Sequence, residues 1–218
     1  MCSSDLKAVQ LGVTSRYSNN AQSCIAAKRF LIAAPISDAF IKAFVEQASA
    51  LKVGDPLLAT TKLGPQARED LRATTARQVS DAVAAGGRVL TGGKSIEGPG
   101  YFYAPTVLVD VPHDAAVARE EFFGPVALVF TFKTEEEAIR LANDTEFGLG
   151  AAVWSKNPER ANAVASQIEA GAVFINDFVR SDPRAPFGGV KGSGVGRELG
   201  ALGARELTNA KLVWESAS

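Results

Sequence analysis

The feature of this sequence that most constrains its fold is a strict alternation of strand-like and helix-like segments between residues 126 and 176. Each strand-like segment is a short apolar run, predicted over 126–132, 148–155 and 172–176. The first helix begins with a capping box, TEEE from Thr134, and the second with Asn157 followed by Pro158, and it is predicted to run to Gly171. This order favours an α/β fold with a largely parallel sheet and flanking helices.

The first half of the chain shows the same two patterns. Helices are predicted over 7–16, 37–52 and 65–85, and strands over 29–33, 88–91 and 101–111. The first helix has no start signal, whereas Ser37 is the expected N-cap of the second. Leu71, Val79 and Val83 form the expected apolar face of the third helix. Since no repeat or low-complexity segment interrupts this order, we expect one α/β domain.

Composition excludes several classes of protein. The 218 residues are 46% hydrophobic and 22% charged, which is ordinary for a globular protein. The net charge of -1, without a basic stripe, argues against a nucleic acid partner. The longest apolar stretches, such as 30–36, are far shorter than the ~20 residues of a membrane-spanning helix, and no secretory signal opens the chain. We therefore expect no membrane partner and a cytoplasmic location.

The cysteine and histidine content argues against a metal centre. Cys2 and Cys24 are too few for a disulfide framework, and the single histidine, His113, cannot complete a typical zinc site with them. His113 follows Pro112 at the end of a strand-like run, where we expect a surface-loop residue. A Cys–His pair would require the fold to bring His113 beside Cys24.

Cys24 ends the segment NNAQSC and is followed by the helix-forming residues IAAKR. At the start of a helix, the dipole and nearby backbone N–H groups favour a thiolate, and Lys28 and Arg29 would add positive charge. The same N–H groups could stabilise an oxyanion when the sulfur attacks a carbonyl carbon. The alternative is a buried structural cysteine, the usual role of a lone cysteine before an apolar run.

Two further segments have the composition of functional loops. EEFFGP, from Glu120 to Pro125, could offer a carboxylate to ribose hydroxyls and a ring to a flat nicotinamide; the alternative is a turn with a buried phenylalanine. PFGGVKGSGVGRELG, from Pro186 to Gly200, contains six glycines, which permit positive φ and close backbone packing. It lacks the strand and βαβ context of a dinucleotide loop, so we expect a tight structural loop.

The order of these motifs is more specific than any one of them. NNAQSC, then EEFFGP about a hundred residues later, then INDF and PFGGVKGSGVGRELG resemble the aldehyde dehydrogenase superfamily over about residues 7–214. SRYSNNAQSCIAAKRFLI and NDFVRSDPRAPFGGVKGSGVGRELG look most like its NAD(P)-dependent succinate-semialdehyde dehydrogenase branch. The resemblance implies the catalytic domain of that family, a small aldehyde substrate, NAD or NADP as cofactor, and a homo-oligomer in the full-length form.

The resemblance also implies roles for individual residues. Cys24 matches the nucleophile, which attacks the aldehyde to form a thiohemiacetal; hydride then passes to the nicotinamide and the thioester is hydrolysed. The Cys24 N–H would be one oxyanion donor. Glu121 matches the glutamate that contacts the nicotinamide ribose, and Phe123 matches the aromatic residue beside the nicotinamide. The aldehyde pocket would be lined by Ser23, Ile25 and Phe187.

The sequence departs from the family pattern in ways that matter for activity. Ala21 stands where the family usually has glycine, and its methyl group is expected to strain the nucleophile turn. In the family, a Rossmann-like cofactor domain, an oxyanion asparagine and a glutamate general base precede the nucleophile, and none has a counterpart here. We therefore expect a catalytic-half fragment that is inactive alone. Its predicted parts are a truncated segment over 1–16, a catalytic domain over 17–205 and an oligomerisation strand over 206–218.

Substrate choice is open at the level of sequence. The carboxylate of succinate semialdehyde needs a cation or several donors near the pocket mouth. Some succinate-semialdehyde enzymes place an arginine six residues before the nucleophile, but Ser18 stands there. Arg180 and Ser181, in the loop that the family folds over the pocket entrance, are the candidates; a solvated loop arginine is the alternative. The competing function is a non-enzymatic interaction or oligomerisation module that kept the fold.

Overall fold

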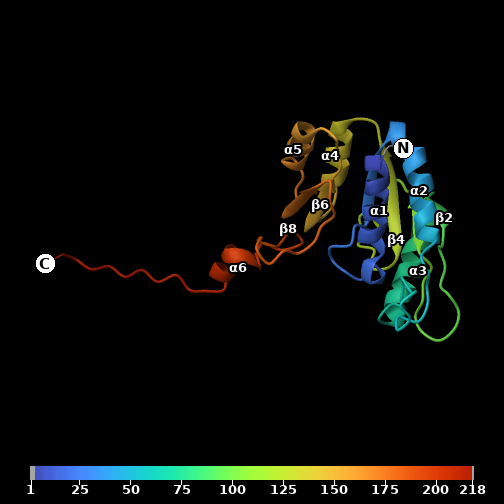
Figure 1. The fold of residues 1–218 in the computed structure, drawn as a ribbon, viewed down its shortest axis with the longest axis horizontal. Coiled ribbons are helices and arrows are strands. Elements are labelled where there is room, and N and C mark those ends of the chain that lie inside the picture. The colour runs from blue at the N-terminus through green and yellow to red at the C-terminus, as the bar shows by residue number, and fades with distance from the viewer. Residues whose placement is uncertain (1–2, 218) are drawn as a thin grey trace.

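A computed structural model describes residues 3–217, so Met1, Cys2 and Ser218, at the ends of the two predicted terminal segments, lie outside the described residues. Helices and strands are interspersed along the chain (Figure 1). The helices are α1 (Ser3–Tyr17), α2 (Ser37–Ser49), α3 (Glu69–Ala84), α4 (Glu135–Asn143), α5 (Pro158–Ala165) and α6 (Gly200–Glu206), with 3-10 helices η1 (Ser18–Ala21), η2 (Ala34–Ile36) and η3 (Ala116–Ala118). The strands are β1 (Arg29–Ala33), β2 (Arg88–Thr91), β3 (Thr106–Val109), β4 (Val126–Phe132), β5 (Phe147–Gly148), β6 (Gly150–Val153), β7 (Ala172–Ile175) and β8 (Val190–Lys191).

The main sheet has four strands in the order β1-β4-β3-β2. Strands β1, β4 and β3 are parallel, in a register that pairs Leu31 with Phe130 and Leu108 with Leu128, while β2 at the edge is antiparallel to β3. Strands β6 and β7 form a separate parallel pair, and β5 and β8 an antiparallel pair. The predicted α/β class with a largely parallel sheet is therefore confirmed.

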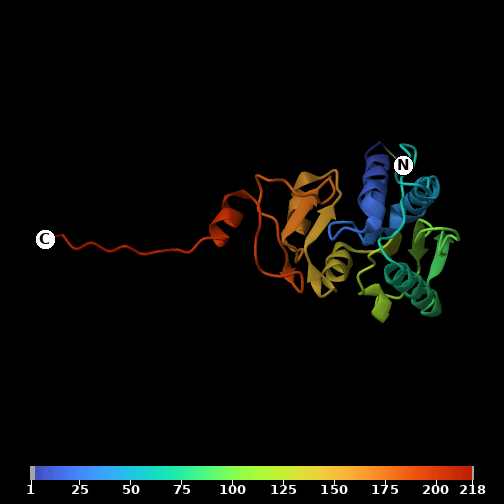
Figure 2. The ribbon, with the colours of Figure 1, turned by 90° about the horizontal axis from the view of Figure 1, so that it is seen from below.

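Helices cover both faces of the main sheet (Figure 2). On one face, α1 and α2 pack against Val107 and Val129; on the other, α3 and the η3 segment pack against Leu108 and Leu128. Because successive strand residues point to opposite faces and both faces are covered, β3 and β4 read as continuous apolar runs. Among residues 3–217, no helix has both the length and the apolar character needed to cross a bilayer.

The predicted N-cap of one helix and the predicted start of another are wrong. Ser37 is the first residue of α2 rather than its N-cap, because η2 leads directly into the helix and the Ser37 hydroxyl donates back to the Ala34 carbonyl at 3.0 Å. The helix predicted from residue 65 begins at Glu69, since Gln66 pairs with Tyr101 in extended conformation. In the same helix, Val79 is buried as expected. Val83, which was also predicted to be buried, is 46% exposed.

The capping signals in the second half are confirmed. The Thr134 side chain accepts from the Glu137 N–H at 3.2 Å, and the Asn157 side chain accepts from the Arg160 N–H at 3.0 Å. The second of these helices ends at residue 165 and not at Gly171, because turns occupy the intervening residues. A Cβ at Gly171 would lie 1.8 Å from a carbonyl oxygen of a neighbouring loop, so this glycine permits a close backbone approach instead.

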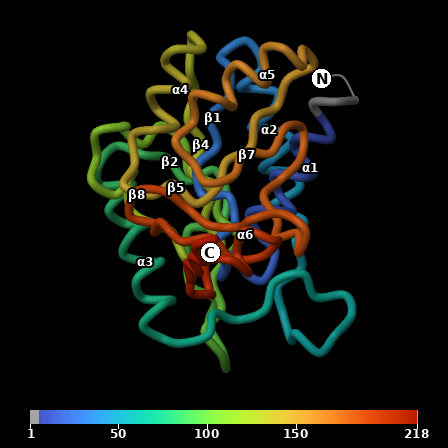
Figure 3. Tube along the Cα trace, turned by 90° about the vertical axis from the view of Figure 1, so that its left-hand side faces the viewer, coloured from blue at the N-terminus to red at the C-terminus, as the bar shows by residue number. Residues whose placement is uncertain are grey.

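Residues 207–217 carry no helix or strand and extend away from the body of the protein (Figures 1 and 2), and Figure 3 views the molecule from the side to which they extend. Leu207, Leu212 and Trp214 are each more than 80% exposed. No strand is formed in this described part of the predicted segment 206–218, so its role in oligomerisation stays a prediction.

Candidate active site

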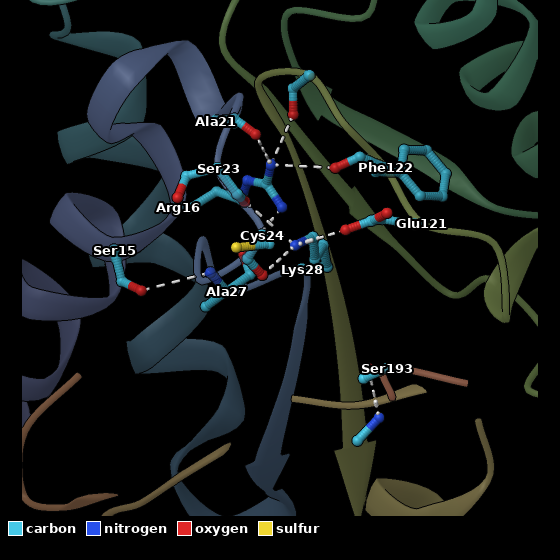
Figure 4. A network of polar contacts seen from close by, with 12 residues as sticks. Ser15, Arg16, Ala21, Ser23, Cys24, Ala27, Lys28, Glu121, Phe122 and Ser193 are labelled. Carbon is cyan, nitrogen blue, oxygen red and sulfur yellow. Dashed lines mark hydrogen bonds and ion pairs between the residues drawn. The ribbon is translucent and has the colours of Figure 1, made fainter. Parts of the chain in front are cut away.

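The NNAQSC and EEFFGP motifs meet because they precede adjacent parallel strands. Residues 22–28 lead into β1, and residues 119–125 lead into β4. Since β1 and β4 are neighbours with the same direction, the segments that precede them lie at the same edge of the sheet. At this junction the N–H of Leu128 donates to the Lys28 carbonyl at 3.0 Å. Two motifs about a hundred residues apart are thereby brought together (Figure 4).

Cys24 lies in a turn and not at the start of a helix, so that prediction is wrong. The N–H of Ala26 donates to the Ser23 carbonyl at 3.1 Å, and the chain enters β1 three residues later, which leaves no room for a helix. Cys24 is exposed, and the alternative of a buried structural cysteine therefore does not hold either. Ser23 and Ile25, the predicted pocket residues, flank it in the same turn and are half-buried.

The backbone N–H of Cys24 makes no hydrogen bond to the described residues. The Ser23 carbonyl accepts both from the Ala26 N–H at 3.1 Å and from Lys28 at 3.3 Å. Because the peptide is planar and trans, the Cys24 N–H points the opposite way. Within residues 3–217 it has no acceptor. An unpaired N–H beside an exposed thiol is the arrangement required of an oxyanion donor.

Lys28 contacts both motifs (Figure 4). Its Nζ lies 2.7 Å from the Cys24 carbonyl oxygen, 3.0 Å from Glu121 Oε1 and 5.8 Å from the centre of the Phe123 ring. Its side chain is 17% exposed, whereas that of Glu121 is 38% exposed. Burial lowers the pKa of Lys28, and the hydrogen bond with the Glu121 carboxylate opposes that effect. Cys24, Glu121 and Phe123 thus share one cationic neighbour.

Arg16, at the end of α1, joins the same two motifs through their backbone. Its guanidinium is fully buried and donates to the carbonyls of Ala27 at 3.0 Å, Ala21 at 3.2 Å, Phe122 at 3.2 Å and Gly124 at 2.8 Å. The first two carbonyls belong to the nucleophile loop and the last two to EEFFGP. Burial lowers the pKa of Arg16 to about 10, so the group remains charged at neutral pH.

Sequence reasoning missed Arg16, although a signal for it exists. Val9, Val13 and Arg16 follow the spacing of one helix face, and both valines are buried against the sheet. An arginine on an apolar helix face must find buried acceptors. Lys28 was noted for its charge, but its contact with Glu121 depends on strand pairing that the sequence does not show.

Side chains of α3 and of the segment before it also support the EEFFGP turn. Gln78 Nε2 donates to the Glu121 carbonyl at 3.1 Å. A Cβ at Gly124 would lie 2.4 Å from Thr75 Oγ1 and 2.5 Å from Gln66 Nε2, so the turn can rest on this buried pair only if residue 124 is glycine. Phe122 is fully buried beneath the turn and Phe123 is half-buried. The predicted alternative, a turn with a buried phenylalanine, therefore describes Phe122, while Phe123 lies beside Lys28.

Ala21 has the backbone strain expected from its replacement of glycine. Asn19, Asn20 and Ala21 have φ of 51°, 54° and 59°, all in the left-handed region. Asparagine tolerates this region better than alanine does. Ala21 is fully buried, and its carbonyl accepts from Arg16. The contact with Arg16 is one of the interactions that hold the strained turn in place.

The remaining predicted substrate residues lie in the loop before β8. Phe187 pairs with Glu198 through two backbone hydrogen bonds of 2.7 Å, and with Arg180 it lines a cavity of about 240 Å³. Arg180 forms an ion pair with Asp177 at 2.7 Å, and Ser181 is exposed. Among residues 3–217, no hydrogen bond, ion pair or ring contact joins this group to the turn of Cys24. The shared pocket of Cys24 and Phe187 stays a prediction.

His113 is not a partner of Cys24. Its ring lies 4.8 Å from that of Phe130, toward the other end of β4, and it is half-buried although it was predicted to be a surface-loop residue. No cluster of three or more His, Cys, Asp or Glu side chains in the described part of the chain is arranged to hold a metal ion.

Comparison with known proteins identifies the family of this chain. The model of the aldehyde dehydrogenase family matches residues 3–213. A protein of Synechocystis named probable succinate-semialdehyde dehydrogenase [NADP(+)] is 52% identical over 95% of this chain and 46% of its own length. A succinate-semialdehyde dehydrogenase [NADP(+)] of Mycolicibacterium paratuberculosis is 51% identical over 100% of this chain and 46% of its own length.

Solved structures show the same fold. The succinic semialdehyde dehydrogenase of Streptococcus pyogenes, solved with NADP+, has a TM-score of 0.93 and 36% identity, covering 97% of this chain and 46% of that one. An NAD-dependent aldehyde dehydrogenase of Sinorhizobium meliloti has a TM-score of 0.90 and 40% identity, covering 93% and 40%. The chain spans about half the length of the curated relatives it matches. On the family match and on relatives of about 50% identity, this chain belongs to the aldehyde dehydrogenase family.

Proposed function

We propose that this chain supplies the nucleophile and the nicotinamide-contacting turn of an NAD(P)-dependent aldehyde dehydrogenase, which oxidises an aldehyde to the carboxylate through a thioester on Cys24. The observation that carries the proposal is the Lys28 ammonium, which contacts both the Cys24 carbonyl and the Glu121 carboxylate. The activity belongs to a longer protein in the relatives, each about twice the length of this chain.

In this proposal the turn around Cys24 performs the attack. The exposed thiol approaches the aldehyde carbon, and the Cys24 N–H donates to the developing oxyanion. The adjoining carbonyls of Ser23 and Cys24 are held by Lys28, so the turn need not reorganise during the reaction. Ser23 and Ile25 shape the pocket on either side.

The residues of the EEFFGP turn fit a nicotinamide ribose. Glu121 has one carboxylate oxygen on Lys28, its side chain is 38% exposed, and its second oxygen can accept from hydroxyl groups. Phe123 offers a half-buried ring next to this carboxylate. A bound nicotinamide dinucleotide supplies the hydride acceptor. We propose NADP as the first cofactor to test, because the relatives are named for NADP(+), with NAD as the comparison.

For the substrate we propose succinate semialdehyde, on the names of the relatives. Arg180 is the candidate for its carboxylate and Ser181 for a hydrogen bond, but the ion pair of Arg180 with Asp177 at 2.7 Å must first be exchanged. The exchange replaces one carboxylate with another, and Arg180 is otherwise exposed. No feature of the described residues specifically favours the competing function, a non-enzymatic module.

The test uses the longest natural polypeptide that contains this sequence. Purified intact, it should reduce NADP when supplied with succinate semialdehyde. Cys24→Ser should remove most of this activity while leaving the Kd for the dinucleotide unchanged, and Cys2→Ser serves as the matched control. Full activity in the Cys24→Ser variant, or dinucleotide binding without oxidation of any aldehyde, would contradict the proposal.

A further inference from the structure

We propose that Lys28 is a positioning residue that holds Glu121 and the Cys24 turn together, and that Lys28 and Glu121 set the electrostatic potential at the Cys24 sulfur with opposite signs. The inference extends the proposed function, because it assigns a third side chain to the site of Cys24 and Glu121.

The hydrogen bonds of Lys28 fix its position. An ammonium group has three N–H donors. Here the acceptors within reach are the Cys24 carbonyl at 2.7 Å, the Ser23 carbonyl at 3.3 Å and the Glu121 carboxylate at 3.0 Å. The Phe123 ring, 5.8 Å from the nitrogen, lies on one side of the group. With each donor directed to an oxygen, the ammonium is held next to the turn that carries the sulfur (Figure 4).

The neighbouring arginine does not share this role. Successive strand residues point to opposite sides, and Arg29 donates to the carbonyls of Leu141 and Ala142 at the end of α4. The earlier expectation that both Lys28 and Arg29 act on Cys24 is therefore wrong for Arg29. Arg16 is a further cation near Lys28, and it is bound to four backbone carbonyls.

Lys28 has one negatively charged and one positively charged neighbour next to the Cys24 turn. Glu121 forms an ion pair with Lys28 at 3.0 Å, Arg16 is a like charge nearby, and Lys28 donates to the Cys24 carbonyl at 2.7 Å. Loss of Lys28 would leave the Glu121 carboxylate beside the Cys24 turn without its ion-pair partner. Loss of the Glu121 charge would leave Lys28 uncompensated. The two substitutions should change the local potential in opposite directions.

Two alkylating reagents can measure this potential without any dehydrogenase activity. Iodoacetate is an anion and iodoacetamide is neutral, and both react with the same thiolate. Both rates are proportional to the fraction of Cys24 present as thiolate, so this fraction divides out of their ratio. The ratio therefore depends on the electrostatic potential that the iodoacetate anion meets near the sulfur. The experiment uses the 218-residue chain with Cys2→Ser, which leaves Cys24 as its single thiol.

We expect Lys28→Met to lower the iodoacetate to iodoacetamide ratio about five-fold and Glu121→Gln to raise it by a similar factor at low salt. Lys28→Arg should preserve the ratio within about two-fold, and 1 M salt should remove most of both shifts. The matched control is Lys133→Met, an exposed lysine at the far end of β4, which should leave the ratio unchanged. Circular dichroism confirms that each variant is folded.

The outcomes separate a charge effect from a structural one. Opposite, salt-sensitive shifts support the proposal. Shifts of the same sign, or shifts that persist in 1 M salt, would overturn it, since they would mean that the substitutions deform the turn. If Lys28→Met does not fold, the proposal is tested by Glu121→Gln alone. An unchanged iodoacetate to iodoacetamide ratio in Glu121→Gln would then overturn it. The proposed dehydrogenase function is tested separately, because alkylation needs neither an aldehyde nor a dinucleotide.

Discussion

Replacing Arg16 with methionine should be among the most damaging single changes in this chain. Methionine keeps an unbranched apolar stem but donates no hydrogen bond, so four backbone carbonyls would lose the donor that they share. A hydrogen bond to a charged donor contributes about 1.5–3 kcal/mol, but four bonds to one group are not additive, and burying the charge has its own cost. We expect a net loss of about 3–5 kcal/mol, a large part of the stability of an ordinary domain.

Urea unfolding followed by circular dichroism measures this loss. Arg16→Lys keeps the charge but loses the planar set of guanidinium donors. Its free energy of unfolding should therefore lie between those of the wild type and Arg16→Met. The matched control is Arg68→Met, because Arg68 pairs with Asp70 entirely at the surface, and its midpoint should be unchanged within error. A loss below about 1 kcal/mol for Arg16→Met, at unchanged m-value, would refute the assignment of Arg16 as the link between the two motifs.

Four further outcomes are expected. The 218-residue chain alone should produce no NAD(P)H from any aldehyde in a 340-nm assay, and turnover by it would contradict the role given to the residues that precede the nucleophile in the family. Gly124→Ala should destabilise the fold by about 1–3 kcal/mol in urea unfolding, because its methyl group would overlap a buried polar pair. Burial, Arg29 and Arg140 lower the pKa of His113, so below about pH 6.5 the unfolded chain binds more protons and stability falls as the pH decreases; His113→Gln should flatten this change in Tm between pH 7 and 5. In the intact protein, Arg180→Ala should lower kcat/KM about ten-fold for succinate semialdehyde and barely change it for an uncharged aldehyde of similar length, whereas an equal loss on both would mean that Arg180 only shapes its loop.

The parts of the fold that the sequence predicted well are those governed by local signals. The strands over 29–33 and 126–132 have the predicted limits, since apolar runs bounded by turn residues define them. Thr134 and Asn157 act as caps through their own side chains. The helix expected after Cys24 failed because helical propensity is a weak preference, and here the start of β1 overrides it.

The sequence predicted the motifs of the site but not the side-chain contacts that join them. The resemblance named Cys24, Glu121 and Phe123, and the structure joins them through a lysine. The contacts of Arg16 with the EEFFGP turn span more than a hundred residues, so they depend on strand order that hydrophobic periodicity cannot specify. Arg180 and Phe187 meet in a separate loop, whose relation to Cys24 the resemblance alone supports.

Because β1 and β4 are neighbouring strands, the distance between the two motifs in space does not depend on how many residues separate them in the sequence. The chain between β1 and the EEFFGP turn leaves the sheet after β1, adds β2 and β3 to it, and returns to the same edge, and strand register fixes both ends of this stretch. Along this stretch, the loop at Gly98 borders open space, where an added side chain would meet no atom within 4 Å. Insertions at this loop would lengthen the chain between the two motifs without displacing either motif. Relatives of this chain can therefore differ in size between the two motifs and still present the same geometry to a substrate.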